Sequence, residues 1–149
     1  MATIYETLRD YIEARLREIT KLGTVYDYPV QEFVNAVYPV AVVYPSSDCV
    51  VEYETTSDDE RWYFFSIDVF YQIKPEGINQ AMIALFDLID DVMAKFSENR
   101  GFDNPAISMP TNTVYLMTEP VKTQWGQIAG KDLIMAKIEL KCRTSVQSS

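Results

Sequence analysis

The residues of this sequence that could carry chemistry are acids and two cysteines, because the chain contains no histidine. Asp87, Asp90 and Asp91 are spaced to share one face of a helix, where carboxylates can hold a divalent cation. No fourth ligand and no glycine-bearing loop accompanies them, so the spacing favours a solvated acidic face. Cys49 and Cys142 lie far apart without a CxxC pair, which favours buried thiols over a zinc site or a disulfide framework.

Asp68 is a further candidate because it interrupts a strand of aromatic residues. It is either a buried carboxylate with a raised pKa or the partner of a lysine across the sheet, Lys137 or Lys141, and the second interpretation is favoured. Motifs for phosphate loops, dinucleotide binding, nucleophile elbows and zinc proteases are absent from the sequence. Without histidine there is also no imidazole base. We therefore expect no catalytic, cofactor-binding or metal-binding residues, and a protein that is not an enzyme.

The net negative charge of the sequence argues against tight binding to nucleic acid. The 149 residues include 13 Lys and Arg against 22 Asp and Glu, a net charge of −9. Tight binding to nucleic acid needs clustered cations, whereas an acidic surface suits a conduit past which DNA slides. The N-terminus lacks a signal-peptide pattern, and no apolar run approaches the ~20 residues that cross a bilayer. We expect one domain over residues 1–149, ordered to about residue 145, with Val146–Ser149 as a flexible tail.

Two amphipathic helices are expected to position these residues. Thr3 and Glu6 have the spacing of a capping box, and apolar residues recur every three or four positions as far as Leu22. Gly23 then suits a helix end in the left-handed conformation. A second helix is expected to begin at Pro75 and to end near Asn99.

Strands fill most of the remaining chain. Pro45–Asp48 is a cluster of turn residues, which predicts a hairpin between strands at Tyr38–Tyr44 and Cys49–Thr55. The other expected elements are a short extended piece near Val25, strands at Arg61–Lys74, Thr113–Glu119 and Lys131–Thr144, and long loops at Phe102–Asn112 and Pro120–Gly130. This order predicts an α+β fold, a two-layer sandwich of an antiparallel or mixed sheet with two helices on one face.

The Arg61–Lys74 strand is unusual because both of its faces are apolar. If Tyr63, Phe65 and Ile67 lie under the helices, Trp62, Phe64 and Phe70 are left on the outer face.

Three such side chains exceed what a monomer normally leaves exposed, so something should cover them. One possibility is that the long loops fold back over them. The favoured one is a subunit interface, with Trp62, Phe64 and Phe70 as its candidate residues.

In its element order the sequence resembles the tail terminator, or tail-completion, proteins of long-tailed bacteriophages. The resemblance includes the Pro-initiated second helix, with Glu76–Gln80, and the closing strand, with Ile138–Cys142. It implies a structural virion protein whose hexameric ring caps the tail tube, stops its polymerisation and provides the surface for joining the neck and head. The implied partners are the tail-tube protein and a neck or connector protein. DNA would pass through the lumen without specific binding, and no membrane or cofactor is involved.

The expected loops supply candidate docking residues for the tube or neck: Asp58, Asp59 and Glu60 at a charged hairpin tip, and Trp125 in the loop Pro120–Gly130. The resemblance places the protein in the virion tail after synthesis in the host cytoplasm. Two alternatives stay open: a tail-tube subunit or neck adaptor of the same virion, and a monomeric α+β module that binds a ligand between its helices and sheet.

Overall fold

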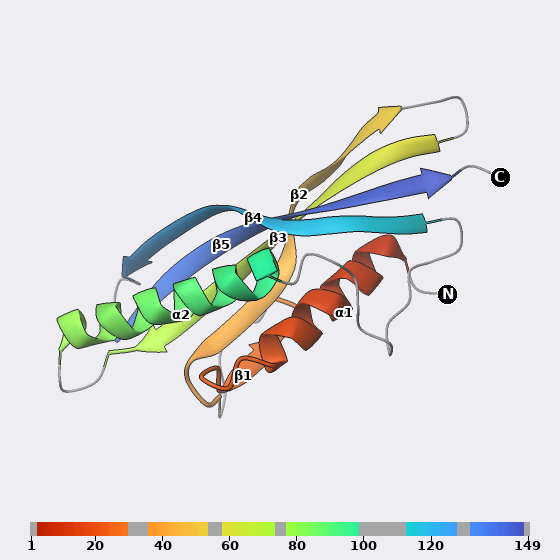
Figure 1. The fold of residues 1–149 in the computed structure, drawn as a ribbon. Coiled ribbons are helices and arrows are strands. Elements are labelled where there is room, and N and C mark those ends of the chain that lie inside the picture. Colours follow the sequence, from red (N-terminus) through yellow and green to blue (C-terminus); the bar gives the residue numbers. More distant parts are fainter. Residues whose placement is uncertain are drawn as a thin grey trace.

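The fold consists of two helices and five strands over the residues that the computed structural model describes, which are 3–29, 36–53, 58–73, 77–98, 113–127 and 132–147 (Figure 1). The expected loop Phe102–Asn112 lies outside these residues. In chain order the elements are α1 (Ile4–Arg17), β1 (Thr24–Tyr26), β2 (Val40–Tyr53), β3 (Asp58–Gln72), α2 (Ile78–Glu98), β4 (Thr113–Gln127) and β5 (Leu133–Gln147).

The five strands form one mixed sheet in the order β1-β2-β3-β5-β4. β1 runs parallel to β2, and every other neighbouring pair is antiparallel. Both helices lie on the same side of this sheet (Figure 1), α1 against β1 and β2 and α2 against β5, β4 and β3. The structure therefore confirms the predicted α+β fold with two helices on one face.

The core lies between the helices and the inner face of the sheet. On β3 the alternate residues Tyr63, Phe65, Ile67 and Val69 are buried there, as the period of two predicts. β5 adds a second buried row, which includes Cys142 and confirms that this thiol is buried. The helices contribute the following buried side chains: Leu8, Ile12 and Leu16 from α1, and Ala81, Leu85, Leu88, Val92 and Phe96 from α2.

The start of α1 follows the prediction but its end does not. Thr3 is the N-cap, and its hydroxyl accepts a hydrogen bond of 3.1 Å from the Glu6 amide. The helix ends at Arg17 rather than near Leu22, with Glu18 as the C-cap, so Gly23 does not cap it.

Gly23 is needed for a different reason. A Cβ at this position would lie 2.4 Å from the carbonyl oxygen of Val37, while the Gly23 amide donates to the Pro39 carbonyl at 2.8 Å. The close approach of two backbone segments therefore requires a residue without a side chain.

The predicted hairpin around Pro45–Asp48 is wrong, because β2 runs through it as one strand. Its pairing with β3 shifts register between Pro45 and Ser47 and again between Ser47 and Val50. Such bulges admit an extra residue without ending the strand. Beyond Val42, no strand among the described residues pairs with the other edge of β2, so Pro45 needs no partner there.

Two further segments predicted as irregular are also strand. β4 continues through Pro120 to Gln127, with a register shift at Pro120, so most of the expected loop Pro120–Gly130 belongs to the sheet. β5 continues to Gln147, where Val146 pairs with Asp59 and Thr113. The tail prediction is therefore wrong for residues 146 and 147, because Val146 pairs with strands on both sides and Gln147 pairs with Asp58 of β3.

Among the described residues, two ion pairs connect the segment just after α1 with α2: Lys21 with Asp91 at 2.9 Å, and Glu18 with Lys95 at 3.2 Å. Asp91 is thus paired with a lysine, as a solvated acidic face would allow. Within the described part of the chain, neither α1 nor α2 combines the length and the hydrophobicity of a membrane-spanning helix.

The core predicts a clear contrast between two substitutions. Phe65→Ala should lower the free energy of unfolding by about 3–5 kcal/mol, because it removes a fully buried ring between the helices and the sheet. Ile83→Ala, at a half-exposed position of α2, should cost about 0.5 kcal/mol or less. Urea denaturation followed by circular dichroism measures both, and equal losses would contradict this assignment of the core.

Candidate functional site

The outer face of the sheet, opposite the helices, carries the residues that the sequence singled out. Trp62, Phe64 and Phe70 lie on it as predicted, and each is half-buried. In the register of β3 with β5, Trp62 lies opposite Arg143 and Phe64 opposite Lys141. Aromatic residues of one strand therefore face cations of the next.

At one end of this face Glu60 holds a charged cluster. Its Oε1 accepts hydrogen bonds from Trp62 Nε1 at 2.6 Å and from Arg143 Nε at 2.7 Å. The Glu60 side chain is only 8% exposed, and that of Arg143 is 33% exposed. Glu60 was predicted at a charged hairpin tip, but it lies within β3 and its side chain is paired across the sheet with Arg143.

Trp62 is covered in part by its own chain. The Lys141 ammonium lies 4.7 Å from the centroid of the Trp62 ring, a cation–π geometry. Neither of the predicted loops supplies this contact; it comes from the neighbouring strand β5. The interface role of Trp62, Phe64 and Phe70 stays a prediction.

Asp68 sits in a second polar cluster that spans three strands. The Tyr44 hydroxyl of β2 donates to Asp68 Oδ2 at 2.8 Å, and Lys137 of β5 lies opposite Asp68 in register. Burial raises the pKa of Asp68, and both the Tyr44 hydrogen bond and the Lys137 charge oppose that shift. The two interpretations of Asp68 thus hold together: it faces Lys137 and still has a raised pKa. Tyr44 was not foreseen.

Two polar side-chain atoms on this face lack a hydrogen bond to any described residue: the acceptor Asp68 Oδ1 and the hydroxyl Ser66 Oγ. Both are buried, and the two residues are neighbours on the outer face of β3. Burial raises the pKa of Asp68, and a hydrogen bond to Oδ1 that would oppose this shift is not supplied by any described residue.

The predicted docking residues are not brought together. Asp58 and Asp59 pair in register with Gln147 and Val146, at the C-terminal end of β5. Trp125 is not in a loop but in β4, opposite Ala136 near the other end of β5. At about 3.3 Å per residue, roughly 30 Å separates the two groups.

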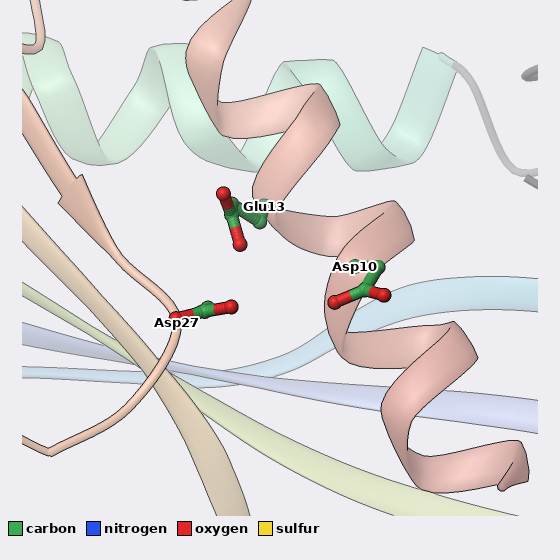
Figure 2. Close-up of side chains that lie close together, drawn as sticks. All are labelled: Asp10, Glu13 and Asp27. Carbon is green, nitrogen blue, oxygen red and sulfur yellow. The ribbon is translucent and has the colours of Figure 1, made fainter. Parts of the chain in front are cut away.

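An acidic cluster outside these predictions lies where α1 meets the residue after β1. The carboxylates of Asp10, Glu13 and Asp27 lie within 4.8 Å of one another (Figure 2).

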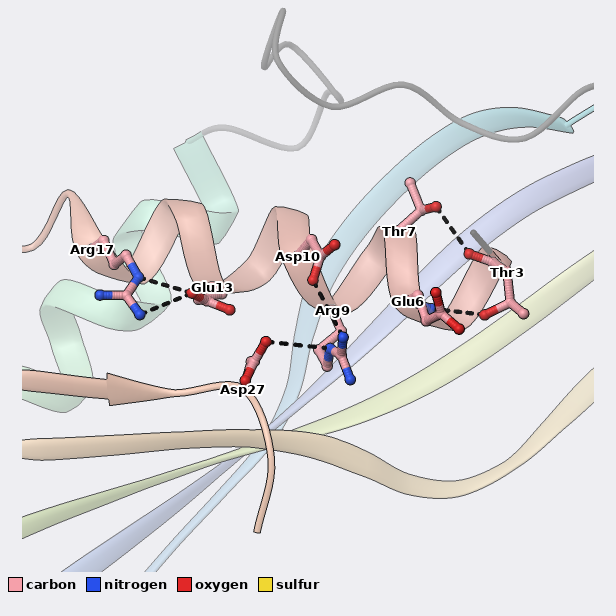
Figure 3. Close-up of polar contacts among 8 residues, drawn as sticks. All are labelled: Thr3, Glu6, Thr7, Arg9, Asp10, Glu13, Arg17 and Asp27. Atoms are coloured by element: carbon pink, nitrogen blue, oxygen red, sulfur yellow. Dashed lines mark hydrogen bonds and ion pairs between the residues drawn. The ribbon is translucent and has the colours of Figure 1, made fainter. Parts of the chain in front are cut away.

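Figure 3 shows arginines beside all three carboxylates: Arg17 pairs with Glu13 at 2.9 Å, and Arg9 pairs with Asp10 at 3.5 Å and with Asp27 at 3.8 Å. Burial raises the pKa of Glu13. Two guanidinium groups compensate the three carboxylates, so the cluster is an ion-pair network. It joins residues far apart in sequence, which no local spacing reveals.

The helical layer carries a second exposed feature that the sequence interpretation missed. Thirteen of the 21 residues of α2 are apolar, more than one core-facing stripe needs. Ile83 is 49% and Phe86 41% exposed, and with exposed Asp87 and Asp90 they form what we call the outward face of α2. The i, i+3 spacing of Ile83 and Phe86 in the sequence could have indicated that these two apolar residues share one face of the helix.

The fold is shared with a chain in the solved virion of a native gene transfer agent particle, with a TM-score of 0.63 at 12% sequence identity. The similarity covers 97% of this chain and 99% of that chain. At this identity the likeness establishes the fold and carries no residue roles across. No protein-family model and no curated protein matches the sequence.

The Glu60 cluster predicts a loss of stability on truncation. Glu60→Ala should lower the free energy of unfolding by about 1–3 kcal/mol, because it leaves Trp62 Nε1 and Arg143 without their acceptor. The matched control is Glu13→Ala, whose partner Arg17 is 57% exposed and which should cost about 1 kcal/mol or less. A double-mutant cycle of Glu60→Ala with Arg143→Ala should show coupling, and additive losses would refute the cluster.

Asp68 predicts a pH-dependent stability of definite sign. Its folded pKa lies above the ordinary value of 3.8, so the folded chain binds this proton more tightly than the unfolded chain. The contribution of Asp68 to stability therefore falls as pH rises through the folded pKa. Asp68→Asn removes this term, so wild type should gain stability relative to the variant on acidification from about pH 7 to about pH 3.

Tyr44→Phe provides the matched control for this titration. It removes the hydroxyl that lowers the pKa of Asp68, so the carboxyl should titrate at higher pH than in wild type. Carboxyl carbon NMR shifts measure the titration, and urea denaturation at each pH measures the stability. A downward movement in Tyr44→Phe would disprove the assigned hydrogen bond.

Proposed function

We propose that this chain is a structural protein of a virion and, more specifically, a tail terminator whose hexameric ring caps the tail tube. The observation that carries the proposal is the fold shared, over nearly the whole of both chains, with a chain of a gene transfer agent virion. The resemblance of the sequence to tail terminators supports the narrower role. The protein would act in the virion tail as a single domain and not as an enzyme.

The distribution of interactions supports an assembly role rather than a catalytic one. On the outer face, Glu60 is held by Trp62 and Arg143, and Asp68 by Tyr44 and the charge of Lys137. The partners of both acids are therefore residues of the sheet, so these acids stabilise the sheet. The remaining exposed features of the described residues are apolar side chains that are half-exposed. Exposed apolar surfaces are typical of contacts between proteins.

The placement of the docking candidates fits a ring with two different rims. Asp58 and Asp59 lie at one end of the long strands, and Trp125 lies near the other. In our proposal one end contacts the last ring of the tail tube, and the other presents a surface to the neck or connector protein. If the outer rim of the ring lacks the surface to which tail-tube subunits bind, no further subunit can add and the tube stops growing.

Closure and charge complete the proposed mechanism. A head-to-tail contact between copies produces a ring when its rotation closes, and this sets the copy number. The net charge of −9 gives the ring a surface to which DNA does not adhere, so DNA passes without specific binding.

Deletion of the coding sequence from the producing particle tests the proposal. A terminator predicts tails of uncontrolled length that lack joined heads, with normal length restored when the gene is supplied in trans. Negative-stain electron microscopy measures the length distribution. Absent tubes would point to a tail-tube subunit, complete tails without heads to a neck adaptor, and unchanged particles would refute a virion role.

A further inference from the structure

We propose that α2 binds a basic amphipathic helix of a different protein along four apolar residues, Met82, Phe86, Ile89 and Met93, which we call the apolar row of α2. The helix that binds there has apolar residues every three or four positions, with Lys or Arg beside them. This inference goes beyond the proposed function, because it rests on α2 itself whether or not the chain caps a tail tube.

The apolar row of α2 has the spacing of a helix-packing surface. Its residues follow one another at intervals of four, three and four positions, which keeps them on one side of the helix. Phe86 is 41% exposed, and the other three are only partly buried, unlike the fully buried stripe that meets the core. The row extends about 16 Å along the helix, enough for about three turns of a second helix.

This row lies on the side of α2 that faces away from α1. Asp91 and Lys95 mark the opposite side, because they are bonded to Lys21 and Glu18 in the segment just after α1. At about 100° per residue, the apolar row lies roughly half a turn from these two residues. α1 and α2 are the helices of the described part of the chain (Figure 1), so no described helix packs on the row.

Acids border the row on its solvent side. Asp90 lies one turn from Phe86, Asp87 lies beside Asp90 on the outward face of α2, and both acids are exposed. No described cation forms an ion pair with either of them. Lys21 is bonded to Asp91, and this hydrogen bond, with a smaller contribution from the charge of Asp87, raises the pKa of Lys21. A protein that binds here must therefore offer apolar contact together with positive charge.

The described elements of this chain do not offer that combination, which argues against a second copy. α1 carries three arginines and three acids, and its apolar side chains are buried in the core. A second α2 would bring the same acids. On the outer sheet face, β3 and β5 carry at least as many acids as cations: Glu60, Asp68 and Glu139 against Lys137, Lys141 and Arg143. Nucleic acid and anionic lipid are disfavoured because they share the negative charge of the acids on α2.

A pair of synthetic peptides tests the surface. The probe is a helix-forming peptide of about 18 residues with leucine at alternating intervals of three and four and lysine beside this row. Its matched control carries glutamate in place of each lysine. In isothermal titration calorimetry with the full chain, the lysine peptide should bind about tenfold more tightly than the glutamate peptide, or better.

Variants of the chain locate the binding. Asp87→Lys combined with Asp90→Lys should reverse the preference, so that the glutamate peptide binds more tightly. Phe86→Gln should weaken binding of the lysine peptide by about fivefold or more, because it removes the most exposed apolar contact of the row. Val37→Gln is the matched control, since Val37 is 64% exposed in the connection between β1 and β2, and it should bind like wild type. Thermal unfolding by circular dichroism checks that each variant folds.

Several outcomes would overturn the inference. Equal affinity for the two peptides, no binding of either, or a preference that the double lysine variant leaves unchanged would each do so. Binding that Phe86→Gln does not weaken would place the peptide elsewhere on the molecule. Self-association of the full chain that Phe86→Gln abolishes in sedimentation velocity would assign the row to a second copy instead. None of these measurements depends on the deletion particles, so either the proposed function or this contact can fail without the other.

Discussion

The pairing of β3 with β5 is the constraint on which the rest of the structure depends. All fifteen residues of β3 pair with β5 without a register shift, so each side chain is assigned to one face along the whole seam. On the inner face this register builds the core from Phe65 and Leu140. On the outer face it sets Asp68 opposite Lys137 and brings Arg143 to Glu60. A register slip of one residue would turn the charged side chains toward the core and the apolar side chains toward solvent.

Much of the fold could be predicted from the sequence, because the signals were local and periodic. The alternation on β3, the cap at Thr3 and the stripe of α2 each reflect contacts that neighbouring residues share. The errors came from residues whose role depends on distant partners. Pro45 and Pro120 were interpreted as breaks, yet each lies at a bulge on an open edge of the sheet. Gly23 was interpreted as a cap, yet it makes room for the backbone at Val37.

The candidate site could be predicted only in part for the same reason. Strand periodicity placed Trp62, Phe64 and Phe70 on the outer face, and Lys137 was named as a partner of Asp68. The burial of Glu60 was not foreseen, because Arg143 reaches it from a strand more than eighty residues later in the chain. Tyr44 was missed because β2 was divided into two strands, which hid its register with β3. The spacing of residues in the sequence thus identified which face of the sheet a side chain lies on. Its interaction partners could be identified only once the order of the strands was known.

The two bulges of β2 have a consequence for the exposed edge of this strand. Beyond β1 this strand presents an edge that no described strand covers, and regular open edges invite fibril growth and amorphous precipitation. Pro45 removes one backbone donor from that edge, and the register shifts on either side of Ser47 interrupt its straight course. The irregular stretch therefore makes this edge a poorer template for pairing with a strand of another molecule than a regular edge would be.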